Sequence, residues 1–153
     1  MSASTDISKS DNTTDTGAWV LLFARLAIAP LFLYSGIGKV MAFSATAGRL
    51  HGGADGFGRF LAAGSIVVEL GCATALVLGL FARQAAAILI LFTIAATLMF
   101  HNFWAAPDAQ VVAQTINFLK NLGLIGLLGL IAHQGAGNFA VDAALRMQPR
   151  NTR

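Results

Sequence analysis

Two residues that can take part in acid–base chemistry stand alone in long apolar stretches of the chain. Glu69 lies near the middle of residues 60–80, and Lys120 lies near the middle of residues 111–132. An ionised side chain at the centre of a bilayer costs about 2.5–3.5 kcal/mol even on insertion-based scales. Each charge therefore needs a partner, and ionisable residues inside a membrane are candidates for a functional site.

The depths of these two charges predict that they meet. At about 1.5 Å per helical residue, Glu69 and Lys120 each lie about 13 Å from the same end of their apolar stretches. Arg25 lies about 20 Å from that end, one or two helical turns from Glu69. We therefore expect an ion pair between Glu69 and Lys120, with Arg25 within reach of the same carboxylate.

The residues that must position these charges form four apolar stretches, at about 18–41, 60–80, 84–103 and 111–132. Each is close to the roughly 20 residues that a membrane-spanning helix needs. Of the 153 residues, 56% are hydrophobic and only 11% are charged, whereas about 25% are charged in a soluble domain. The sequence thus predicts an all-α membrane protein, a four-helix transmembrane bundle.

The polar segments define the domain boundaries and the orientation. Residues 1–17 are predicted to be a disordered polar tail, residues 18–143 the membrane domain, and residues 144–153 a basic C-terminal tail. The Gly-rich residues 42–59 are predicted to form a loop outside the membrane. Lysines and arginines favour the side that holds both termini, so both termini are expected in the cytoplasm.

One polar stripe runs along each predicted helix, and four stripes that face inward would line a polar cleft. Leu76, Leu80 and Leu128 are expected to close this cleft on the side of the termini. The expected cleft residues are Arg25, Tyr34, Ser35, Lys39, Glu69, His101, Asn117, Lys120 and Asn121. A second pattern places small residues at four-residue spacing, which lets another helix pack closely. These residues are Gly71, Ala75 and Gly79.

Several kinds of site are not expected. The single cysteine, Cys72, excludes an internal disulfide, a Cys-x-x-Cys redox pair and a cysteine zinc site. His101 and His133 fall near opposite membrane faces, so they do not predict haem binding, and no metal site is expected. The ten Lys and Arg residues are scattered rather than grouped with aromatic residues, so nucleic-acid binding is not expected.

Residues in all four predicted helices carry a resemblance to a known family. They are Arg25, Ser35, Gly36 and Lys39, then Glu69, Gly71, Leu78, Gly79, Leu80 and Arg83, then His101, Asn102, Phe103, Lys120 and Asn121, and the closing segment 137–142. Their order and spacing resemble the DoxX family, which is related to the DoxD subunit of thiosulfate:quinone oxidoreductase. The resemblance covers about residues 20–143 and implies a multi-pass protein of the bacterial inner (cytoplasmic) membrane. It also implies the redox, quinone or thiol-stress roles proposed for some members.

Three functions fit this pattern, and the sequence leaves them open. The first is a redox-linked or quinone-interacting accessory subunit, in which Glu69, His101 or Lys120 handles the protons that a quinol loses with its electrons. Tyr34 or Phe103 would pack on the quinone ring. The second is a noncatalytic membrane scaffold whose ion pair only holds the helices in register. The third is a permeability factor for a proton or a small polar solute.

An accessory role is favoured over that of an enzyme acting on its own. The expected partners are the lipid bilayer, a redox partner protein and further copies of the chain. Quinone is the candidate cofactor.

Overall fold

The structure is a computed structural model that describes residues 4–147, with side chains described from residue 16 to residue 145. The elements in chain order are α1 (Ser4–Met41), α2 (Phe43–Gly48), α3 (Phe57–Leu78), α4 (Ala82–Phe100), η1 (Phe103–Ala105), α5 (Asp108–Gln134) and α6 (Val141–Met147). Four segments are long and apolar enough to cross a membrane, namely Thr16–Met41, Phe57–Leu78, Ala82–Ala105 and Asp108–Gln134. The predicted all-α, four-helix transmembrane architecture is therefore confirmed.

The helices differ from the predicted ones mainly at their ends. α1 begins at Ser4, so the helical backbone runs through most of the segment that the sequence predicts to be a disordered tail. Extending an existing helix costs much less than nucleating one, and residues 4–16 contain neither proline nor glycine. The predicted loop 42–59 contains the short helix α2. The predicted C-terminal tail begins inside α6, and residues 148–153 lie outside the described residues.

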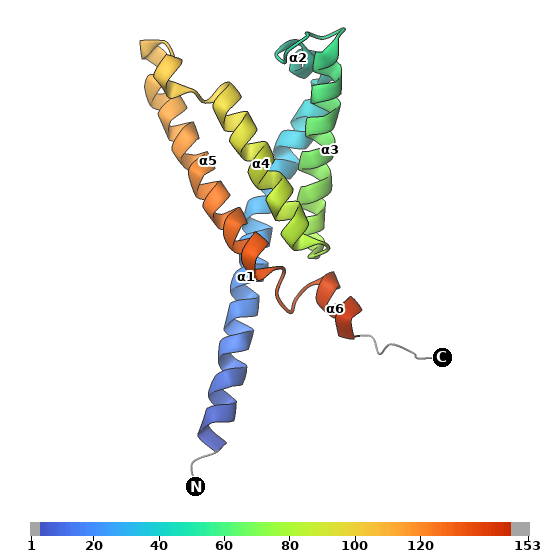
Figure 1. The fold of residues 1–153 in the computed structure, drawn as a ribbon, viewed down its shortest axis with the longest axis vertical. Coiled ribbons are helices and arrows are strands. Elements are labelled where there is room, and N and C mark those ends of the chain that lie inside the picture. The colour runs from blue at the N-terminus through green and yellow to red at the C-terminus, as the bar shows by residue number, and fades with distance from the viewer. Residues whose placement is uncertain (1–3, 148–153) are drawn as a thin grey trace, which may run out of the picture.

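The four long helices are arranged as two pairs that meet at one end of the molecule (Figure 1). α1 packs along α3, and α4 packs along α5. α3 and α4 also contact each other, because a short turn joins the lower ends of these two helices as drawn in Figure 1. Toward the other end the pairs diverge, and α2 lies against α3 there. We call the end at which the pairs meet the closed end, and the end that holds α2 and η1 the open end.

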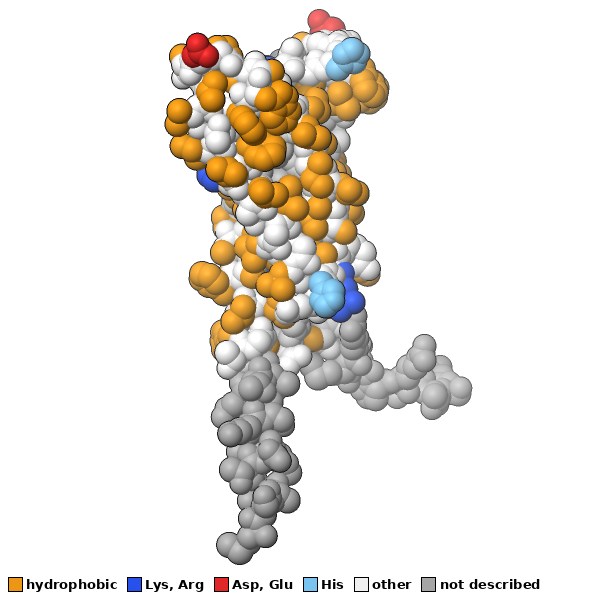
Figure 2. Space-filling view, turned by 60° about the vertical axis from the view of Figure 1, so that its left-hand side comes forward, with side chains coloured by type: hydrophobic (Ala, Val, Ile, Leu, Met, Phe, Trp, Pro, Cys, Tyr) orange, Lys and Arg blue, Asp and Glu red, His pale blue; other side chains and the backbone are white. Residues whose placement is uncertain are grey.

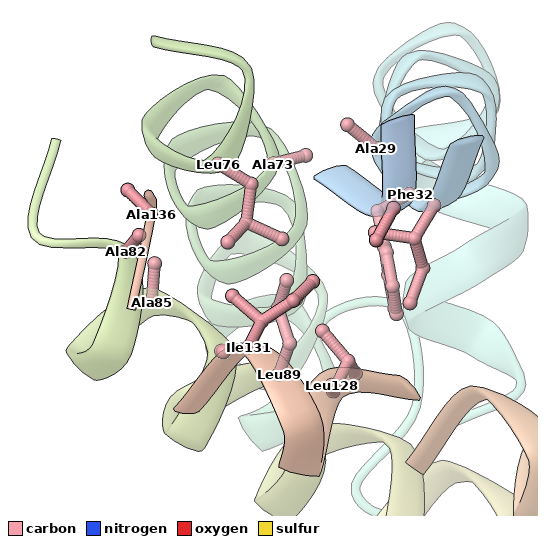
Figure 3. Packing of buried hydrophobic residues seen from close by; sticks show 13 residues of the cluster. Ala29, Phe32, Ala73, Leu76, Ala82, Ala85, Leu89, Leu128, Ile131 and Ala136 are labelled. Carbon is pink, nitrogen blue, oxygen red and sulfur yellow. The ribbon is translucent and has the colours of Figure 1, made fainter. Parts of the chain in front are cut away.

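The hydrophobic core lies toward the closed end. Its largest fully buried apolar side chains come from all four long helices and are Ile28, Leu76, Leu89, Leu128 and Ile131. Figure 3 shows that several of them converge on a common centre between α3, α4 and α5. Leu76 and Leu128 are buried at this end as predicted, whereas Leu80 is only half-buried.

The outer surface of the bundle is largely apolar. Large hydrophobic side chains are exposed on every long helix, among them Phe23, Val67, Leu91 and Val112. Figure 2 shows hydrophobic side chains spread over one face of the described part of the molecule. Lipid tails are as apolar as these side chains, so their exposure in a bilayer does not carry the cost that it has in water.

Arg25 joins three parts of the chain at the closed end. Its guanidinium is fully buried; Nη1 donates to the Leu76 carbonyl over 3.0 Å, and Nη2 donates to the Phe139 carbonyl. The Leu76 carbonyl belongs to the last turn of α3, where the helix dipole favours a positive charge. The predicted position of Arg25 near Glu69 is therefore wrong. Arg25 instead ties α1 to the end of α3 and to the segment after α5.

Gly79 makes this arrangement possible. It ends α3 with a φ of 67°, a backbone conformation that favours glycine. A Cβ at this position would collide with Arg25 and would lie 2.6 Å from the Ala140 Cβ. Gly79 is therefore a turn residue packed under the guanidinium, not part of a strip on the side of a helix.

Nothing in the described chain packs against Gly71 of the predicted small-residue strip, where a Cβ would meet nothing within 4 Å. A close approach of two helices occurs instead at Gly36 of α1. A Cβ there would lie 2.7 Å from the Leu70 side chain of α3 and 3.3 Å from the Glu69 Cβ. The missing side chain at Gly36 therefore brings α1 close to α3 beside the buried carboxylate.

Gly79→Ala should destabilise the protein, whereas Gly71→Ala should not. A non-glycine residue in the left-handed region costs about 1–3 kcal/mol, and the added methyl group also meets Arg25. Thermal unfolding of both variants in the same detergent, followed by the helical circular dichroism signal, measures the difference. Equal unfolding temperatures for the two variants would contradict the contact assigned to Gly79.

Candidate functional site

A buried ion pair connects α1 to α3. Lys39 Nζ lies 2.6 Å from both carboxylate oxygens of Glu69. Ser35 accepts a hydrogen bond from the same ammonium group over 2.9 Å and donates one to Glu69 Oε1 over 3.0 Å. Glu69 is 3% exposed and Lys39 is 26% exposed, so the carboxylate is buried while the ammonium group stays partly accessible.

The partner of Glu69 is therefore Lys39, and the predicted pair with Lys120 is wrong. Side chains on a helix lean toward its N-terminus, and this direction carries the Lys39 ammonium group back to Ser35 and to the depth of Glu69. A depth counted from Cα positions misses this shift and leaves Lys39 too near the helix end. Lys120 is exposed on α5 and has no polar partner among the described residues.

A second polar group joins α4 to α5. The buried hydroxyls of Thr93 and Thr97 each donate to the backbone carbonyl four residues earlier. Asn121 of α5 donates from Nδ2 to Thr97 Oγ1 over 2.9 Å. Near the open end, His101 Nδ1 lies 2.8 Å from Gln114 Oε1. The polar face of α4 is thus satisfied by its own backbone and by α5.

Lys39 also connects the two helix pairs. Its ammonium group lies 5.6 Å from the ring centroid of Phe92 on α4, which is a cation–π contact. One side chain of α1 therefore contacts a carboxylate of α3 and an aromatic ring of α4.

The two helix pairs enclose a cleft of about 780 Å³. Its polar lining comes from both polar groups and from the region of α2, and includes Ser35, Lys39, Thr46, Arg49, Glu69, Thr93, His101 and Asn121. The rest of the lining is mainly apolar and includes the aromatic rings of Phe32, Phe60, Phe92 and Phe100. A volume of about 300–1,000 Å³ and an apolar lining with a few polar groups are typical of small-molecule sites.

The structure brings some of the predicted site residues together and separates others. Ser35, Lys39, Glu69, His101 and Asn121 line the cleft. The other predicted residues do not: Arg25 binds the end of α3, Tyr34 is 85% exposed, Lys120 is exposed, and Asn117 is half-buried on α5. Phe92, not Tyr34, is the ring beside the ion pair.

The predicted set lacks four polar residues that line the cleft, Thr46, Arg49, Ser65 and Thr93, and also Gln114, which contacts a lining residue. Gln114, the partner of His101, lies three residues before Asn117 and shares its side of the predicted helix, so this spacing could have identified it. Thr46 and Arg49 line the open end. They lie in and just after α2, a helix that the sequence does not predict, so no helical face could be assigned to them.

Comparison with known proteins gives four findings. The family model described as DoxX matches residues 20–102. The chain is 30% identical over 123 residues to the inner membrane protein YphA of Escherichia coli (strain K12), across 80% of this chain and 88% of YphA. It is 28% identical over 125 residues to the inner membrane protein YqjF of the same organism, across 82% of this chain and 91% of YqjF. No solved structure matches the chain.

Removing Lys39 should destabilise the protein far more than removing Lys120. Lys39→Met leaves the Glu69 carboxylate buried without a cation, and the loss of one partner of a buried pair costs about 3–5 kcal/mol. Lys120→Met removes an exposed charge and should not lower the free energy of unfolding. Denaturant unfolding in detergent micelles compares the two variants.

A double variant provides the control for this prediction. Lys39→Met combined with Glu69→Leu leaves no unpaired charge, so it should recover part of the stability that Lys39→Met loses. Equal losses for Lys39→Met and Lys120→Met would contradict the assigned ion pair.

Proposed function

The chain belongs to the DoxX family, and we propose that it is an inner-membrane accessory protein that binds a quinone in the cleft beside Lys39 and Glu69. The observation that carries this proposal is a charged, partly accessible hydrogen-bond donor set against aromatic walls in one cleft. The names of both relatives, which are inner membrane proteins, support the location.

A quinone head group matches the chemistry of the cleft. It is a flat ring that carries two carbonyl oxygens, so it needs an apolar or aromatic surface and a few hydrogen-bond donors. Lys39 and Asn121 supply donors, and Phe92 and Phe100 supply ring surfaces. Gly64 on α3 and Ala95 on α4 both line the cleft and are exposed, so an isoprenoid tail can pass between these helices to the lipid.

The ion pair gives the cleft a means to accompany electron transfer with proton transfer. Reduction of a quinone takes up two electrons and two protons. The ammonium group of Lys39 can donate one proton to a quinone oxygen, and water that enters from the open end supplies the second proton and reprotonates Lys39. Glu69 holds that ammonium group in place and balances its charge. The electrons come from a redox partner protein in this proposal, which makes the chain an accessory subunit.

We also propose that both termini lie in the cytoplasm, so that the cleft opens toward the periplasm. The distribution of lysine and arginine in the short connecting segments supports this orientation. The open end carries α2 and the cleft lining residues Thr46 and Arg49. A periplasmic redox partner would therefore reach the bound ring from that side.

Protein purified from its native membranes should carry quinone, and Glu69→Gln should carry about tenfold less. A neutral amide cannot hold the Lys39 ammonium group as the carboxylate does, and a hydrogen bond to a charged group contributes about 1.5–3 kcal/mol. Quinone per mole of protein is measured by extraction and mass spectrometry. Cys72→Ser is the matched control, since Cys72 lies one turn from Glu69 and does not line the cleft. Equal quinone content in Glu69→Gln and wild type would remove the proposed role.

A scaffold without a ligand is the second candidate, and the position of the ion pair favours it. The pair joins α1 to α3 beside the close approach at Gly36, where it can act purely to fix the packing of the two helices. The swapped variant Lys39→Glu with Glu69→Lys should restore the unfolding midpoint but not quinone retention, because the donor then lies on the other helix. A restored unfolding midpoint, together with no quinone in either the wild type or the swapped variant, would favour the scaffold.

A further inference from the structure

Lys120 is an unpaired charge on the outer side of α5. Its side chain is exposed, it does not line the cleft, and it makes no hydrogen bond, ion pair or ring contact in the described part of the structure. Along the helix axis it lies about 18 Å from the first residue of α5 and about 21 Å from the last. The charge therefore sits near the middle of the span, where it is most costly.

Neither membrane surface offers Lys120 a partner. The hydrocarbon core is about 30 Å thick, so its edges lie about 15 Å from the centre and the lipid phosphates lie beyond them. A residue near the middle of a span is too far from both interfaces for its side chain to reach the phosphate groups. The missing partner must therefore lie within the membrane.

The surface around Lys120 is open to another helix. α5 is the least buried of the four spans. In its most apolar window 11% of the residues are buried, against 39% in α1 and 22% in both α3 and α4. Ala113, Ile116, Lys120 and Gly123 are exposed along one side of α5. A Cβ at Gly123 or Gly126 would meet nothing within 4 Å, so a neighbouring backbone can approach closely.

Among the described residues, a second copy of the chain offers no carboxylate that could pair with Lys120. Glu69, the carboxylate in the middle of a described span, is buried and bound to Lys39. Asp108 lies at the start of α5, about 18 Å along the axis from Lys120, and copies inserted in the same orientation keep that difference in depth.

We propose that this side of α5 docks a transmembrane helix of a different protein that carries an Asp or Glu near the bilayer centre. The partner's carboxylate pairs with Lys120, and its helix packs over Gly123 and Gly126. The inference is independent of the ligand of the cleft, because Lys120 and the cleft lie on different sides of α5.

Full-length protein in vesicles of phosphatidylethanolamine and phosphatidylglycerol tests the proposal. The probe is a synthetic 21-residue Leu/Ala transmembrane peptide with one Glu at its centre, and the matched probe has Leu there. Energy transfer between labelled protein and labelled peptide gives the affinity. The Glu peptide should bind about threefold to thirtyfold more tightly than the Leu peptide, since interhelical polar contacts contribute about 0.6–2 kcal/mol.

The variants show whether Lys120 and its surface carry this preference. Lys120→Arg should keep the higher affinity for the Glu peptide, and Lys120→Met should abolish it. The unfolding midpoint of Lys120→Met should equal that of the wild type. Lys120→Met with Leu91→Lys moves the charge to an exposed position on α4 and should not restore it.

Three results would overturn the proposal. One is equal affinity of the wild type for the two peptides. Another is full restoration of the preference for the Glu peptide by Leu91→Lys, which would mean that a lysine at any lipid-facing position can provide this preference. The third is competition by unlabelled copies of the chain that depends on Lys120, which would make a second copy the occupant.

Discussion

The low dielectric constant of the bilayer makes every buried charge a constraint on this bundle. Glu69 is satisfied by Lys39 and Ser35, which fixes α3 against α1. Arg25 donates hydrogen bonds from both terminal nitrogens to backbone carbonyls, which fixes α1 against the end of α3 and the segment after α5. An unpaired charge would cost more than the net contribution of most single contacts, so these two clusters determine how the helices can be placed.

The two clusters divide the bundle into parts with different properties. At the closed end, Arg25 lies beside a tightly packed apolar core that includes Leu76 and Leu128. In the other part, the Lys39–Glu69 pair lies at a cleft between the two helix pairs. A buried charge thus lies in a closed, tightly packed region at one end of the bundle. At the cleft, the other charged cluster leaves an ammonium group partly accessible.

The helices and the cost of each charge could be predicted from the sequence, but the pairing of the charges could not. Hydropathy and length are sufficient to identify four spans. From the predicted site residues, Ser35, Lys39, Glu69, His101 and Asn121 line the cleft between the helix pairs. Depth estimates use Cα positions, whereas the ammonium group of Lys39 lies where its side chain leans.

Lys120 shows a second reason why depth along the helix axis does not predict the contacts of a side chain. Adjacent residues on a helix are separated by about 100° around the axis, so Lys120 and Asn121 point in different directions. Asn121 does, and Lys120 faces outward. Which of two neighbouring polar residues turns inward depends on the packing of α5 against α4, and this packing is not encoded in depth or in local spacing.

The hydrogen bonds of Arg25 also impose an order on biosynthesis. Its acceptors, the carbonyls of Leu76 and Phe139, lie 51 and 114 positions further along the chain. While the ribosome synthesises the protein, α1 emerges before the segments that carry these two carbonyls. The guanidinium therefore has no final partner until α3 is complete, and its second site closes only when the segment after α5 has emerged. The closed end of the bundle is thus the last part of the fold to be finished, although its central residue is among the first to be made.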